Sequence, residues 1–94
     1  MKVFKYPIDL NDRDQIISVP GIHTSAVMVG NDPSGDLCVW IQFDPDRVSS
    51  SHHRIIVKAT GEDSAHIAPI YHLGSVVRDH LVWHVYSPTL RKAP

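Results

Sequence analysis

The sequence predicts an all-β protein: a single small antiparallel β-sandwich or partly open barrel of about six or seven strands, with at most short helical turns. Three observations lead to this prediction. The apolar runs are short and rich in Val, Ile, Thr and aromatic residues, which favour strands. Clusters of Pro, Gly, Asp and Asn end nearly every run. No window of about eleven or more residues shows the 3.6-residue period of an amphipathic helix.

The expected strands alternate with turn formers along the whole chain. The apolar runs that we expect to form them lie at 3–6, 16–19, 22–30, 37–43, 54–60, 70–77 and 81–86. The best hairpin spans 22–43 and turns at the cluster NDPSGD, residues 31–36. A second hairpin spans 70–86 and turns near Arg78-Asp79. Two of the short connections, 9–15 and 62–68, could form helical turns.

The 94 residues are expected to form one domain. We expect a single β domain at 1–88 and a loose C-terminal tail at 89–94. Residues 44–53, DPDRVSSSHH, are expected to form a mobile loop. The only cysteine, Cys38, has no partner for an internal disulfide. Since the N-terminus also turns polar at once, we expect a cytoplasmic protein.

The balance of charge excludes two classes of function. Nine Lys and Arg face ten Asp and Glu, for a formal net charge of −1. A general nucleic-acid binder needs a basic face that displaces phosphate counterions, and a polybasic membrane-surface protein needs one too. No apolar run approaches the ~20 residues of a membrane span. We therefore expect no general nucleic-acid binding and no membrane association.

The stretch HLVWHVYSP, at 80–88, raises the question of a metal site. His80 and His84 would share one ion on a helix, where positions i and i+4 lie on one face. On a strand they are separated by about 13 Å, too far for bonds of ~2.0 Å to one zinc ion. No zinc-binding, nucleotide-binding or catalytic-nucleophile motif occurs elsewhere. The serines and histidines of SSSHH at 49–53 are neighbours in the sequence, whereas a catalytic triad is assembled from distant segments. We predict no enzyme, no cofactor and no metal.

Alternation along two of the strands separates a core face from an unusual outer face. The residues expected in the core are Leu37, Val39, Ile41, Phe43, Leu81, Trp83 and Val85. The residues on the opposite faces are Cys38, Trp40, Gln42, Val82, His84 and Tyr86. These carry no formal charge yet can form hydrogen bonds, a composition typical of interfaces. We predict one shared non-core face, with Trp40, Gln42, His84 and Tyr86 binding a partner. The alternative is a second small core covered by a loop or the N-terminal segment.

Four segments together resemble a family of small, uncharacterised proteins of tailed bacteriophages. They are MKVFKYPI at 1–8, LCVWIQFDPD at 37–46, ATGED at 59–63, and IYHLGS with LVWHVY between 70 and 86. The chain departs from the pattern at Ala59, where glycine is expected, and in the SSSHH loop, whose length varies. The resemblance implies no enzymatic activity. It implies a protein in the cytoplasm of the infected bacterial host.

Three functions remain after these exclusions. The first is a phage-type protein that binds a host bacterial protein through a sheet face and modulates or inhibits it. The second is a sponge for a nucleotide-like ligand, although phosphates call for clustered Arg or Lys and the cations here are scattered. The third is a structural protein of the virion or its assembly. A homodimer, formed across a strand edge or across the face with Trp40, is left open.

Overall fold

The computed structural model describes residues 1–63 and 67–94. Within these ranges the chain forms seven strands and one short 3-10 turn, which confirms the predicted all-β class. The elements are β1 (Lys2–Pro7), β2 (Asp14–Val19), β3 (Gly21–Asn31), β4 (Leu37–Pro45), β5 (Ser51–Ala59), η1 (Pro69–Tyr71), β6 (His72–Arg78) and β7 (Leu81–Tyr86). Both predicted hairpins are present, as β3–β4 and β6–β7. The helical turn considered at 62–68 includes residues outside the described ranges.

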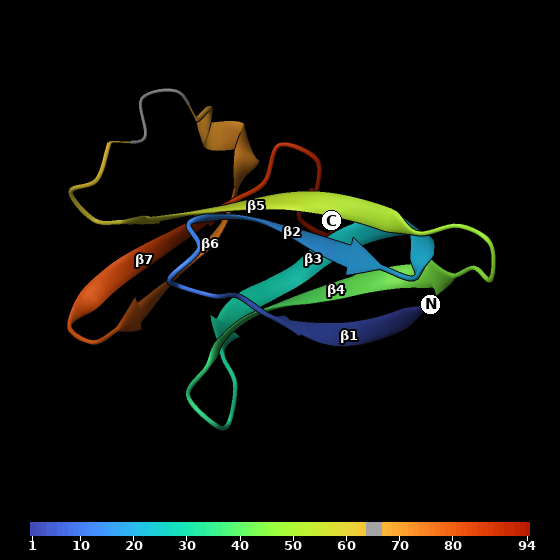
Figure 1. Ribbon diagram of the computed structural model, residues 1–94, viewed down its shortest axis with the longest axis horizontal. Helices are drawn as coiled ribbons and strands as arrows, with labels where there is room; N and C mark the ends of the chain where they lie inside the picture. The colour runs from blue at the N-terminus through green and yellow to red at the C-terminus, as the bar shows by residue number, and fades with distance from the viewer. Residues whose placement is uncertain (64–66) are drawn as a thin grey trace.

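The strands form two antiparallel sheets that pack on each other as an open sandwich (Figure 1). One sheet has the order β1-β4-β3, and the other has the order β2-β5-β7-β6. Alternate residues of β4 and β7 face the space between the sheets, as their patterns predict. Phe43 and Trp83, for example, keep only 1% and 8% of their surface exposed.

Leu81 is an exception to the predicted core. It is 45% exposed and lies outside the apolar cluster between the sheets. Leu81 forms the last pair of the β6–β7 hairpin, opposite Arg78. The next two residues towards the turn, Asp79 and His80, both have positive φ, of 54° and 65°. These angles define the tight turn typical of two-residue hairpins. The hairpin tip therefore extends beyond the core.

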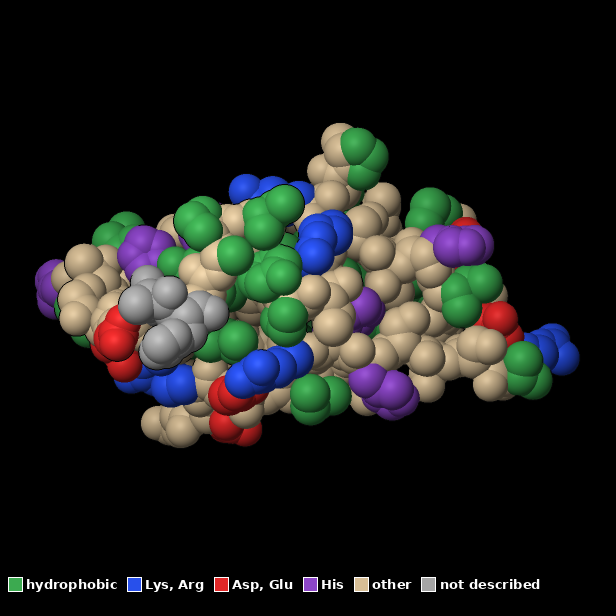
Figure 2. All heavy atoms as spheres, turned by 90° about the horizontal axis from the view of Figure 1, so that it is seen from above, with side chains coloured by type: hydrophobic (Ala, Val, Ile, Leu, Met, Phe, Trp, Pro, Cys, Tyr) green, Lys and Arg blue, Asp and Glu red, His purple; other side chains and the backbone are tan. Residues whose placement is uncertain are grey.

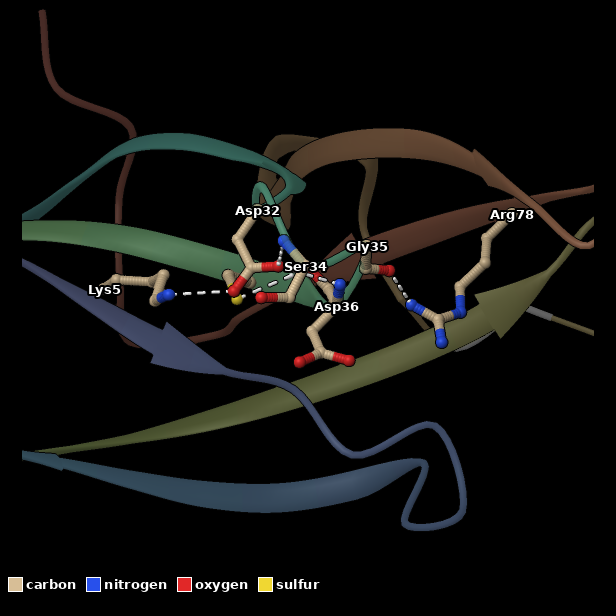
Figure 3. A network of polar contacts seen from close by, with 7 residues as sticks. Lys5, Asp32, Ser34, Gly35, Asp36 and Arg78 are labelled. Atoms are coloured by element: carbon tan, nitrogen blue, oxygen red, sulfur yellow. Dashed lines mark hydrogen bonds and ion pairs between the residues drawn. The ribbon is translucent and has the colours of Figure 1, made fainter.

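The turn at 31–36 forms hydrogen bonds to residues of both sheets (Figure 3). Two backbone N–H groups of the turn donate to the Asp32 carboxylate at 2.9 Å, and the Lys5 ammonium of β1 donates to it at 2.8 Å. Arg78 of β6, in the other sheet, donates to the carbonyl oxygen of Gly35. Gly35 has a φ of 87°, which favours glycine. The hydrogen bond from Lys5 holds the pKa of the Asp32 carboxyl below its usual value.

The predicted mobile loop at 44–53 is mostly strand. β4 extends to Pro45 and β5 begins at Ser51, so only 46–50 connects them. His53 points inward and is 6% exposed. One of its ring nitrogens lies 2.8 Å from Thr24 Oγ1 and the other lies 3.0 Å from Thr89 Oγ1. A histidine can lie in a core when both of its ring nitrogens have hydrogen-bond partners. The polar composition of residues 44–53 therefore led to the wrong prediction of a mobile loop.

The C-terminal tail is anchored rather than loose. Leu90 is fully buried, and Ser87 Oγ accepts its backbone N–H at 2.9 Å. The backbone of Ala26 on β3 makes two hydrogen bonds to the tail. Its N–H donates to the carbonyl oxygen of Arg91, and its carbonyl oxygen accepts the N–H of Ala93, both at 2.7 Å. The tail thereby pairs with the edge of β3 and closes part of it. The β domain consequently includes residues beyond 88.

Histidine burial predicts a pH-dependent stability. Burial, with a smaller contribution from His52, lowers the pKa of His53 below its usual value. The unfolded chain therefore binds more protons than the folded one between the unfolded pKa of ~6.5 and the lower folded pKa. The free energy of unfolding should fall as the pH decreases through this window. His53→Gln keeps a donor and an acceptor but does not titrate, and should reduce the decrease. Urea unfolding at about pH 7.5 and about pH 5.5 measures the difference, and an equal decrease in both proteins would refute this prediction.

Candidate functional site

The outer surface of the three-stranded sheet forms a continuous side-chain patch around Trp40. Trp40 lies opposite Lys5 on β1 and opposite Met28 on β3. Its neighbour on this surface, Gln42, lies opposite Val3 and Ser25. We call this surface the Trp40 face and define it by six residues: Val3, Lys5, Ser25, Met28, Trp40 and Gln42.

The centre of the Trp40 face is apolar and accessible. Val3 and Met28 keep 51% and 50% of their surface exposed, and Trp40 is half-buried. Gly30 leaves room beside them, because a Cβ there would lie 3.0 Å from the terminal methyl of Met28 and 3.9 Å from the Trp40 ring. Gln42 Nε2 donates to Ser25 Oγ at 2.8 Å, which fixes the amide. No described segment therefore covers the centre of this face.

Charge is nearly absent from the Trp40 face. Among its six residues only Lys5 carries a formal charge, and its ammonium is already bonded to Asp32 at 2.8 Å. Asp44, the next residue on this side of β4, lies at the margin of the face, 3.0 Å from His23 Nδ1. Cys38 points to the same side of β4 but is fully buried, with its Sγ 3.4 Å from the carbonyl oxygen of Asp36 in the 31–36 turn. Burial raises the pKa of the Cys38 thiol. The accessible part of the face is therefore the amphipathic group around Trp40.

The predicted four-residue binding face is wrong as a single surface. Trp40 and Gln42 lie on β4, whereas His84 and Tyr86 lie on β7 in the other sheet. The outer faces of the two packed sheets point away from each other. Alternation along a strand separates inside from outside, but it does not specify which sheet the strand joins. β7 joins the four-stranded sheet because it pairs with β5 and β6.

His84 belongs to a directed chain of hydrogen bonds on the outer face of that sheet. Its Nδ1 lies 2.7 Å from Ser75 Oγ and its Nε2 lies 3.0 Å from Thr60 Oγ1. Thr60 donates its hydroxyl proton to the carbonyl oxygen of Val82 at 3.2 Å, so its oxygen accepts from His84 Nε2–H. The Nδ1 of neutral His84 then accepts from Ser75, whose oxygen accepts from His72 Nε2–H at 2.8 Å. One arrangement of protons satisfies the whole chain.

Through these hydrogen bonds and one ring contact, the side chains of His72, His84 and Tyr86 form a single connected group. The ring of His72 meets the ring of Tyr86 edge to face, with centroids 5.3 Å apart. Burial is the main cause that lowers the pKa of His72. His72, Ser75 and Thr60 were not among the site residues predicted from the sequence. A signal existed, because a hairpin turning at 79–80 places Ser75 opposite His84.

A hollow on the same side of the molecule bears on the nucleotide alternative. Figure 2 looks down on β5 and the segment after it, where hydrophobic and basic side chains lie close together. The cations Arg13, Arg54 and Lys58 help to line a hollow of about 340 Å³. Arg54 makes two bonds to the Asp14 carboxylate, at 2.8 and 2.5 Å, and Arg13 pairs with Glu62. Because two of the three cations already bind carboxylates, the hollow does not favour a phosphate ligand.

No metal site emerges from the described residues. Across 1–63 and 67–94, no three His, Cys, Asp or Glu side chains come together as ligands. His66 lies outside the described residues. His80 occupies the β6–β7 turn and His84 the strand that follows. The absence of a bound metal remains a prediction.

The fold and the Trp40 face define a small, open two-sheet β-sandwich with one amphipathic outer surface. A family model described as a domain of unknown function, DUF7352, matches residues 1–94, and the chain belongs to that family. No curated protein and no solved structure matches the chain. In the described ranges, no helix has the length and hydrophobicity of a membrane span.

Proposed function

We propose that the protein is a binding module that docks on another protein through the Trp40 face and modulates or inhibits that protein. The observation that supports this most is the accessible group of Trp40, Met28 and Val3, whose charged neighbour Lys5 is already paired with Asp32. Trp and Met are enriched at the centres of protein interfaces, and charged residues are depleted there. A rigid sheet surface also loses little conformational entropy on binding.

We propose further that the partner is a protein of a bacterial host and that the two meet in the cytoplasm of an infected cell. The support is the resemblance of the four segments to proteins of tailed bacteriophages. In this proposal the protein acts by occupying a surface of its partner and catalyses no reaction. The paired cations on the other side of the molecule give less support to a nucleotide sponge.

Affinity capture followed by titration with the captured protein tests the proposal. Trp40→Ala should weaken the complex by about 2 kcal/mol or more, as expected for a central aromatic anchor. His84→Ala is a suitable control, because His84 lies on the other sheet and should leave the affinity nearly unchanged. Isothermal titration with both variants measures the two effects. An unchanged affinity for Trp40→Ala, or a larger loss for His84→Ala, would reject the Trp40 face as the docking surface.

A further inference from the structure

The two edges of the three-stranded sheet differ in how they are protected. The C-terminal tail bonds to Ala26 and covers part of the β3 edge. β1 pairs with β4 on one side, and no described strand pairs with its other side. In Figure 1, β1 is the outermost ribbon of its sheet. An open strand edge is a template for another extended chain.

The register shows which backbone groups face the open edge. The N–H of Ile8 donates to the carbonyl oxygen of Leu37 at 2.9 Å, one position beyond the last pair of β1 and β4. In an antiparallel ladder the bonded positions alternate, so the even-numbered residues of β1 bond to β4. Val3, Lys5 and Pro7 therefore direct their backbone groups outward. Since proline has no N–H, the edge offers the N–H and C=O groups of Val3 and Lys5.

An apolar hollow lies next to this edge, on the inner side of the sheet. It measures about 350 Å³ and is lined by Lys2, Phe4, Pro20, Phe43, Pro45, Asp46 and Arg47. Phe4 is 47% exposed, and its ring meets Phe43 edge to face with centroids 5.2 Å apart. A strand added to β1 would direct alternate side chains to the inner side, beside Phe4. One of these side chains would therefore enter the hollow.

The charges around the hollow indicate the chemistry of such a strand. Lys2 and Arg47 form no ion pair with any described residue. One oxygen of the Asp46 carboxylate accepts two backbone N–H groups of its own loop, at 2.9 and 3.2 Å. Two cations therefore stand against one carboxylate around the hollow. A second copy would bring its own Lys2 and Arg47 to this edge, and neither cation has an ion-pair partner among the described residues. An acidic segment complements these cations, so a second copy is the poorer occupant.

We infer that the open edge of β1 is a second binding site. It adjoins the Trp40 face, because the backbone of Val3 and Lys5 forms the edge while their side chains belong to that face. It takes an extended segment of another protein by antiparallel or parallel strand addition. The segment carries a large apolar or aromatic residue that enters the hollow beside Phe4, and acidic residues that meet Lys2 and Arg47. Backbone bonds to Val3 and Lys5 hold the segment in register.

Titration of the isotope-labelled protein with defined peptides tests this inference. The probe is an acetylated and amidated Asp-Val-Phe-Val-Asp peptide. The controls are Lys-Val-Phe-Val-Lys and a probe with N-methyl groups on all five residues, which has no backbone N–H of a residue to donate from either strand edge. The probe should shift the amide resonances of Val3 and Lys5 and slow their exchange with water. The control peptides should bind at least about tenfold more weakly, because each lacks the matching charges or the backbone donors.

Two variants of the chain locate the site. Val3→Pro removes one N–H that points outward from β1 and leaves the bonds between β1 and β4 in place. It should lower the affinity for the probe peptide by about fivefold to tenfold. Arg47→Glu should weaken it through charge, whereas Lys92→Glu makes the same charge change in the tail and should not. Equal binding of the three peptides, shifts away from β1, or self-association through β1 in light scattering would overturn the inference. Because the assay contains no partner protein, its failure would leave the proposal for the Trp40 face intact.

Discussion

Trp83→Ala is expected to lower the free energy of unfolding by about 3–5 kcal/mol, the usual cost of removing a large aromatic side chain from a core. The Trp83 side chain lies between the sheets with only 8% of its surface exposed. Its indole N–H donates to the carbonyl oxygen of Arg78 at 3.2 Å, and the guanidinium of Arg13 lies 4.6 Å from the ring centroid. Alanine would leave a cavity and remove both contacts. Urea unfolding of the variant measures the loss.

The control for this experiment is the other tryptophan of the chain. Trp40→Ala removes the same side chain from the accessible outer face, so its effect on the free energy of unfolding should be clearly smaller. Equal destabilisation by the two substitutions would mean that the Trp40 face is a second core. That result would also remove the basis of the proposed docking surface.

Leu90→Ala is expected to lower the free energy of unfolding by about 2–5 kcal/mol, the range for truncation of a buried leucine. Leu90 is fully buried although it lies four residues from the C-terminus. Its loss should also weaken the pairing of the following residues with Ala26. Urea unfolding gives the energy, and amide exchange of Ala26 and Ala93 reports on the pairing.

A substitution within the same tail controls for position. Lys92 is exposed, and Lys92→Ala should change the free energy of unfolding by no more than about 0.5 kcal/mol. If Leu90→Ala were equally mild, the tail would contribute nothing to the fold and the original expectation of a loose tail would be right.

The features that could be predicted from the sequence are those set by neighbouring residues. The alternation of Leu37, Val39, Ile41 and Phe43 identified the buried side of β4, because side chains of a strand point alternately to opposite faces. The turn formers at 31–36 located the β3–β4 hairpin. Trp40 was correctly placed on the outer side of its strand for the same reason.

The features that could not be predicted depend on distant segments. His84 was assigned to the face of Trp40 because nothing local records that β7 pairs with β5. His53 was assigned to a loop because its partners, Thr24 and Thr89, are 29 and 36 residues away. Leu90 was assigned to a loose tail because the β3 edge that its neighbours join lies far upstream. In each case tertiary pairing outweighs the local polarity of the segment.

The chain contains two tryptophans, and their indole N–H resonances give the most direct test of the central claim. One belongs to the accessible Trp40 face and the other to the core. Titration of the isotope-labelled protein with its captured partner should shift or broaden the Trp40 indole resonance and leave that of Trp83 almost unchanged. An unchanged Trp40 resonance in a saturated complex would contradict the proposal that this face binds the partner.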